Sequence, residues 1–268
     1  MAAEDITVVL PIGSPEGTNE LMGDIIAQNT ALAANSPIAT DFDWVAIAAQ
    51  HLLCKQLKAD ADLADDEMQG NRNIAETKIG SGEGQTLQVL NTLHYFIVKS
   101  RDFLKVKYNV TPESLEVWGF NVVISQFEGK RTVAIDIPLG SPTDMIELAA
   151  NINKRHTALG VNSPLTGKVD MLLFAGVTQD AKDFYEKAEN NRIEKEAKNN
   201  QLANLLGYAE GQTIDTPGTT YYNIGLIRDL LLATYSEKPK ELLYWGFEVH
   251  IGSSSHGGGG GTPPAPVE

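Results

Sequence analysis

The chain has 268 residues, of which 21 are Lys or Arg and 35 are Asp or Glu, giving a formal net charge of −14. Its hydrophobic fraction of 42% is that of an ordinary globular protein and excludes wholesale disorder. The negative charge disfavours nucleic acid as a partner. No apolar run approaches the roughly 18 residues that span a bilayer, and the N-terminus lacks a secretion signal. We therefore expect a cytoplasmic protein without membrane insertion.

Four short motifs occur twice, and the members of each pair are separated by 127 positions. PIGSP at 11–15 matches PLGSP at 138–142, NSP at 35–37 matches 162–164, EGQT at 83–86 matches 210–213, and WGF at 118–120 matches 245–247. No gap is needed to hold the four pairs in register, so we predict a tandem duplication. The predicted modules are residues 1–127 and 128–251, followed by a Gly/Ser/Pro-rich flexible tail at 252–268.

The elements at the start of each module are predicted from short local patterns. Residues 6–10 and 133–137 are rich in β-branched side chains and end at proline, which predicts a strand. A helix is expected after each Gly-Ser-Pro turn, capped in the second module by Asp144 with Glu147 three residues later. A long amphipathic helix is expected over about 41–79 and again over about 168–206. Gly70 could interrupt the first of these, and Gly80 and Gly207 suit a left-handed C-cap.

The later elements repeat in the same order. Leu90, Leu93, Ile97 and Leu104 predict an amphipathic helix, as do the aligned apolar residues of the second module. Pro112 favours a short helix that ends at the Trp-Gly pair, and a strand is expected at 120–124. A hairpin over 122–137, with Glu128 and Gly129 at its centre, is expected to join the modules. The predicted fold class is mainly α with minor β: a tandem duplication of a three- or four-helix bundle-like module with pseudo-two-fold symmetry.

The duplication leaves one strand at each end of the chain, at 6–10 and 247–251, without a partner from the central hairpin. Soluble proteins seldom leave strand edges bare. We expect these strands to pair with each other, either within one chain or between neighbouring chains. The second arrangement would generate a head-to-tail polymer.

Several sequence patterns that could indicate catalysis or ligand binding are better explained by structural roles. The glycine-rich residues 80–86 lack the lysine of a phosphate-binding loop, and Glu83 would repel phosphate. The five histidines include no pair at the helical spacing of a zinc site, and Cys54 is the single cysteine. An acidic cluster departs from the spacing of a calcium-binding loop; its members are Asp60, Asp62, Asp65, Asp66 and Glu67. We predict no catalytic residues, no metal and no cofactor.

Two sets of repeated residues are the candidates for structural or interaction roles. Arg101-Asp102 and Arg228-Asp229 form either a repeated polar site or an ion pair that fixes helix packing, and the ion pair is favoured. The second set comprises Trp118 and Trp245, with Phe120 and Phe247 two residues after them. These rings form either a stacking surface or the plug of a core, and the plug is favoured.

The function that we expect is a non-enzymatic structural or protein-interaction module that self-assembles through its terminal strands. Its partners would be further copies of itself or another protein. The alternative is a small-molecule or peptide-binding protein with a pocket between the two helical repeats. An enzyme is the least favoured class.

Overall fold

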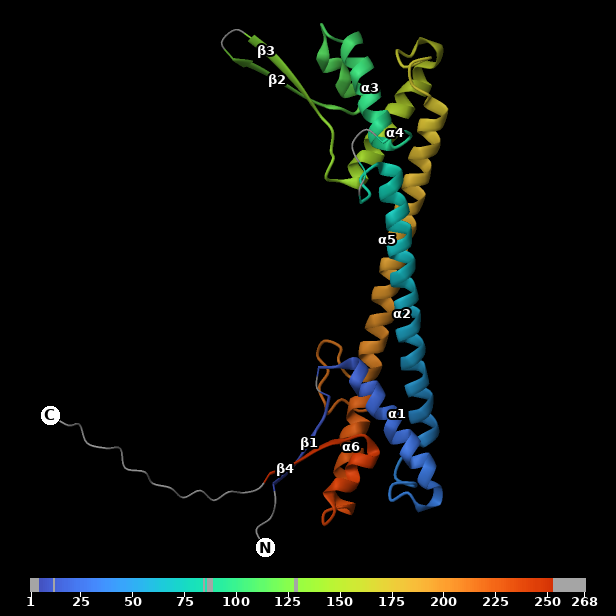
Figure 1. Cartoon of the computed structure of the whole chain (residues 1–268), viewed down its shortest axis with the longest axis vertical. Helices are drawn as coiled ribbons and strands as arrows, with labels where there is room; N and C mark the ends of the chain where they lie inside the picture. The colour runs from blue at the N-terminus through green and yellow to red at the C-terminus, as the bar shows by residue number, and fades with distance from the viewer. Residues whose placement is uncertain (1–4, 12, 84, 86–88, 128–129, 253–268) are drawn as a thin grey trace, which may run out of the picture. The chain divides into compact units, whose positions relative to one another are not determined.

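The computed structural model describes residues 5–11, 13–83, 85, 89–127 and 130–252 (Figure 1). The chain is mainly helical, with two small antiparallel sheets, as the fold class predicted. None of the helices in the described ranges combines the length and the apolar composition that crossing a membrane requires. The chain divides into two compact units. Unit 1 comprises Met1–Ala61 and Glu196–Glu268, and unit 2 comprises Asp62–Lys195. Each unit thus combines residues from both sides of position 127/128.

Unit 1 packs short elements from the two ends of the chain around one core. It contains β1 (Asp5–Val9), α1 (Pro15–Leu32), η1 (Ala33–Asn35), α6 (Thr220–Thr234), η4 (Pro239–Trp245) and β4 (Glu248–Gly252). The core includes Ile25 on α1, Ile227 on α6 and Trp245, all with at most 1% of their surface exposed. Burying such side chains stabilises the unit by about 25 cal/mol per Å² of apolar surface.

Unit 2 repeats this plan with the middle of the chain. It contains α3 (Leu93–Lys107), η2 (Pro112–Trp118), β2 (Asn121–Phe127), β3 (Lys130–Asp136), α4 (Pro142–Leu159) and η3 (Gly160–Asn162). Its core includes Ile97, Trp118 and Ile152, and Phe96 stacks on Phe174 with 5.1 Å between ring centroids. The β2–β3 ribbon projects from the helices of this unit (Figure 1).

Two helices of 36 residues, α2 (Trp44–Ile79) and α5 (Met171–Leu206), contribute to both units. In unit 1, Cys54 and Leu57 of α2 pack with Leu202 and Leu206 of α5. In unit 2, later positions of α2 pair with earlier positions of α5, for example Lys78 with Asp180 at 2.7 Å. The two helices therefore run antiparallel within each unit.

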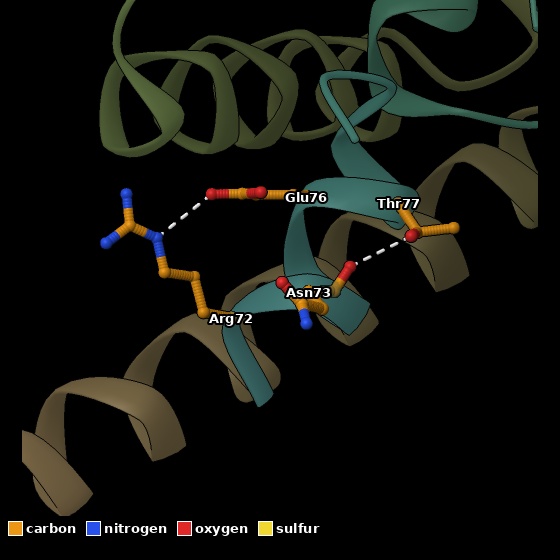
Figure 2. A network of polar contacts seen from close by, with 4 residues as sticks. All are labelled: Arg72, Asn73, Glu76 and Thr77. Carbon is orange, nitrogen blue, oxygen red and sulfur yellow. Dashed lines mark hydrogen bonds and ion pairs between the residues drawn. The ribbon is translucent and has the colours of Figure 1, made fainter. Parts of the chain in front are cut away.

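Side chains on α2 also bond along their own helix. Arg72 Nε donates to Glu76 Oε1 at 3.0 Å, and Thr77 Oγ1 donates to the Asn73 carbonyl at 2.8 Å (Figure 2). Exposed side-chain pairs at this spacing each contribute only about 0.2–0.5 kcal/mol to the stability of a helix. Helix α2 continues through Gly70, so the predicted interruption at this glycine is wrong.

The elements after position 127 repeat the bounds of those before it. Helices α4, α5 and α6 begin and end 127 positions after α1, α2 and α3, and η4 has the same relation to η2. Two pairs of positive-φ glycines recur at the same spacing: Gly80 and Gly207 follow α2 and α5, and Gly119 and Gly246 follow Trp118 and Trp245. The positive φ of Gly80 and Gly207 confirms the left-handed turn predicted at these two helix ends.

The N-caps of α1 and α4 are serines. Ser14 Oγ accepts from the Gly17 amide at 3.1 Å, and Ser141 Oγ accepts from the Asp144 amide at 3.2 Å. Proline follows each serine at the first helical position, where its missing N–H costs nothing. The prediction that Asp144 caps α4 is therefore wrong, because Asp144 lies in the first turn and is itself capped.

The terminal strands pair with each other within the chain. β1 and β4 form an antiparallel ladder in which Ile6 is opposite Ile251 and Val8 is opposite Val249. β2 and β3 form the second ladder, with Val122 opposite Ile135, as the predicted hairpin requires. Its centre at 128–129 and the tail at 253–268 lie outside the described residues. Intrachain pairing is thus the arrangement found for the terminal strands.

Candidate functional site

The repeated aromatic residues lie in the cores of the two units. Trp118 and Phe120 are 0% and 2% exposed in unit 2, and Trp245 and Phe247 are each 1% exposed in unit 1. Such rings cannot stack on a sugar or peptide from solution, so they act as core plugs. The Trp118 indole nitrogen is buried without a hydrogen-bond partner among the described residues.

The glycine after each tryptophan allows close approach to a neighbouring helix. Gly119 has φ +92°, and a Cβ added to it would lie 3.0 Å from the Asn151 Cβ on α4. Gly246 has φ +85°, and its added Cβ would lie 2.8 Å from the Asp24 Cβ on α1. Glycine is required at both positions by conformation and by space.

The repeated Arg-Asp pairs are ion pairs on the surfaces of α3 and α6. In Arg101 both Nε and Nη2 lie within hydrogen-bond distance of Asp102 Oδ1, at 2.9 and 2.8 Å. Arg228 holds Asp229 Oδ1 in the same way, at 2.7 Å from each nitrogen. Asp102 and Asp229 are 59% and 61% exposed, so solvent screens these pairs and each contributes at most about 1 kcal/mol.

An outward-facing groove of about 660 Å³ runs along α3 on the side away from the core. Six of its lining residues form a band along the helix, which we call the α3 stripe: Tyr95, Val98, Lys99, Asp102, Phe103 and Val106. Leu90, just before the helix, completes the lining and is 67% exposed, while Phe103 and Val106 are 38% and 77% exposed. The stripe is thus a largely apolar surface in contact with solvent.

The equivalent positions of α6 form a second band, the α6 stripe: Tyr222, Gly225, Leu226, Asp229, Leu230 and Ala233. Leu226 and Leu230 are 39% and 40% exposed. The prediction that Leu90 lies on the inner face of α3 is wrong, because Leu90 precedes this helix and is exposed. The rest of both stripes was not predicted from the sequence. The signal was present as apolar residues at positions 95, 98, 103 and 106, opposite the buried face.

A smaller hollow of about 330 Å³ lies in unit 2 beside Gly119. Residues from both sides of position 127/128 line it, namely Asn121 on one side and Asp136, Asp144, Glu147 and Asn151 on the other. Three carboxylates give this hollow a negative potential, so it suits a positively charged group.

Cys54 and His51 lie on α2 in unit 1, and both have altered acidity. Burial raises the pKa of the Cys54 thiol, and the Thr220 side chain opposes the increase. Burial, with repulsion from Lys55, lowers the pKa of His51. His51 Nδ1 lies 3.0 Å from Asn19 Oδ1. A neutral, buried thiol is a poor nucleophile.

The acidic cluster of α2 is partly engaged by α5. Asp60 contacts Lys198 at 3.3 Å within unit 1, and Asp65 contacts Lys195 at 2.8 Å within unit 2. Glu67 Oε2 accepts from Asn191 at 2.8 Å. Over the ranges that the structure describes, no three His, Cys, Asp or Glu side chains are grouped so that they could hold a metal ion.

The candidate surface is therefore the pair of stripes on α3 and α6, with the acidic hollow as a separate feature. Comparison of the chain with protein-family models, with curated proteins and with solved structures finds no match.

Proposed function

We propose that this protein is a non-enzymatic protein-interaction module that binds partner proteins through the outward faces of α3 and α6. The observation that carries the proposal is the groove along α3, whose lining is mainly apolar and open to solvent. Contiguous apolar surface costs free energy in water and is typical of a site that a partner covers. The apolar residues of the stripe, at 95, 98, 103 and 106, lie on one side of α3, and such a helix face can pack against a second helix.

The same proposal includes a tandem duplication with pseudo-two-fold symmetry. It is supported by the motifs at 127-residue spacing and by helices whose bounds recur at that spacing. Duplication would supply two related surfaces in one chain, so a partner with two sites could gain affinity by avidity.

Assembly through the terminal strands is the weaker form of this proposal. β1 and β4 already bond to each other, so only the outer edge of each strand remains for another chain. The helical stripes need no rearrangement of the chain before they bind. We therefore place the interaction surface on α3 and α6.

Site-specific photo-crosslinking in the cells that produce the protein tests this proposal. A benzophenone amino acid would replace Phe103 on α3 or Leu230 on α6. The matched control is the same replacement of Tyr244, a large side chain on η4 that is 70% exposed. We expect adducts of higher mass from positions 103 and 230 but not from 244. Absence of adducts from both stripes would contradict the proposal.

A second candidate is binding of a cationic ligand or peptide in the hollow beside Gly119. Asp136, Asp144 and Glu147 favour it because they face the hollow without a lining Lys or Arg. Titration with a lysine-containing tripeptide, followed by the amide resonances of Asn121 and Asn151, tests this candidate. Saturable shifts support it, and unchanged resonances contradict it.

A further inference from the structure

We infer that the partner of the α3 stripe is the α3 stripe of a second copy of this chain, bound antiparallel about a two-fold axis. This inference rests on the proposed function, because it names the partner of a surface whose interaction role is itself proposed. Its support is the self-complementary order of the residues along the stripe.

The stripe is set opposite the buried face of α3. Leu93, Ile97 and Leu104 are fully buried against the core of unit 2. Positions 95, 99, 102 and 106 follow one another at intervals of four, three and four residues, which keeps them on the opposite side of the helix. Val98 and Phe103 flank this row on its two sides. A helix from another molecule can therefore lie along the row without disturbing the core.

The charges of the stripe match under a two-fold operation. When the axis passes between residues 100 and 101 of two antiparallel helices, Lys99 is opposite the partner's Asp102, and Asp102 is opposite the partner's Lys99. The same operation places Tyr95 opposite the partner's Val106. Each contact occurs twice, as an isologous interface requires.

The side chains are suitably placed for these contacts. Asp102 is 59% exposed, and Arg101 contacts it through Oδ1. Lys99 Nζ lies 5.5 Å from the centre of the Tyr95 ring, so its ammonium group is held over the stripe. Opposite charges beside apolar contacts fix the register and orientation of such a helix pair.

The α6 stripe lacks this self-complementarity, which argues for α3 as the contact. Leu226 occupies the position of Lys99, and Asp229 occupies that of Asp102. Two antiparallel α6 stripes would place each Asp229 opposite Leu226, without a compensating cation. Pairing of α3 with α6 would give one ion pair, whereas pairing of α3 with α3 gives two.

Sedimentation equilibrium of the full chain over a hundredfold concentration range provides the test. We expect the wild type to pass reversibly from monomer to dimer. Lys99→Glu should weaken dimerisation by about tenfold or more, because like charges then face each other twice. The double variant Lys99→Glu with Asp102→Lys should restore dimerisation, because both ion pairs then form again with their charges exchanged. Lys240→Glu is the matched control, because Lys240 is an exposed lysine on η4 outside both stripes, and it should leave dimerisation unchanged.

The variants are compared only after their circular dichroism and melting temperature match those of the wild type. A wild type that stays monomeric overturns the inference, as does growth beyond a dimer, or a dimer that Lys99→Glu weakens no more than Lys240→Glu does. A monomer that nevertheless crosslinks to a different protein from position 103 would leave the proposed function standing. Absence of both dimer and adducts would overturn the two together.

Discussion

Val8 of β1 lies opposite Val249 of β4 in the ladder that joins the two ends of the described chain, and both side chains pack against the core of unit 1. Leu10, just after β1, is 6% exposed in the same core. The ends of the chain thus contribute to the stability of unit 1.

Deletion of residues 1–10 should therefore lower the free energy of unfolding by at least about 2 kcal/mol, since the loss of a buried leucine alone costs about that much. Urea denaturation followed by circular dichroism measures the change. Val8→Ala should give a smaller loss of the same sign. An unchanged unfolding midpoint after deletion would show that the terminal ladder adds nothing to stability.

Trp118→Ala and Trp245→Ala should each destabilise the protein by about 3–5 kcal/mol, because each empties a large site in a closed core. Trp44 is the comparison: it is only half-buried, and its Nε1 donates to the Ile38 carbonyl at 3.2 Å. Trp44→Ala should cost less than either core variant. Equal melting temperatures for wild type and the two core variants would be incompatible with the packing described above.

Gly119→Ala and Gly246→Ala should each cost about 1–3 kcal/mol, because an L-residue is strained at positive φ and its Cβ meets the facing helix. Gly70→Ala is the matched control within α2, where an added Cβ meets nothing within 4 Å. It should stabilise the chain by about 0.5–1 kcal/mol through helix propensity. Thermal unfolding of the three variants checks the contrast, and a loss of stability at Gly70→Ala would refute it.

The lowered pKa of His51 predicts a loss of stability in mild acid. The ordinary pKa of a histidine side chain is 6.5, and burial in the folded state is the main cause that lowers the pKa of His51 below this value. The unfolded chain therefore binds the proton first as the pH falls through 6.5, which favours unfolding. Stability should decline from pH 7.5 toward the lower folded pKa, and His51→Gln should reduce this decline. Parallel pH profiles for wild type and variant would contradict the assignment.

Much of the fold was predictable because the informative residues control local geometry. Prolines at 112 and 142 favour the first turn of a helix, and glycines at 80 and 119 allow left-handed turns. The β2–β3 hairpin also follows from local pattern, and the burial of Trp118 was the favoured of two alternatives. The sequence left open whether the terminal strands pair within one chain or between chains. Asp144 misled the cap prediction because Ser141, directly before Pro142, is the N-cap and places Asp144 inside the first turn.

The candidate surface was harder to predict. Phe103 and Val106 sit among charged residues on the polar side of α3, where scattered apolar side chains are normal. Only the helix bounds and the burial of Ile97 show that Val106 shares an outward row with Tyr95 and that Phe103 flanks this row. The contribution of α2 and α5 to both compact units was also beyond local pattern, because it depends on which distant residues each helix contacts.

The claim that the outward face of α3 contacts protein is tested most directly by hydroxyl-radical footprinting of Phe103. The protein would be oxidised inside the cells that produce it and, separately, as dilute purified protein, with Tyr244 as the exposed aromatic control. The account predicts that Phe103, normalised to Tyr244, is oxidised several-fold less inside cells, because a protein partner covers it. Equal normalised oxidation in the two conditions would contradict the account.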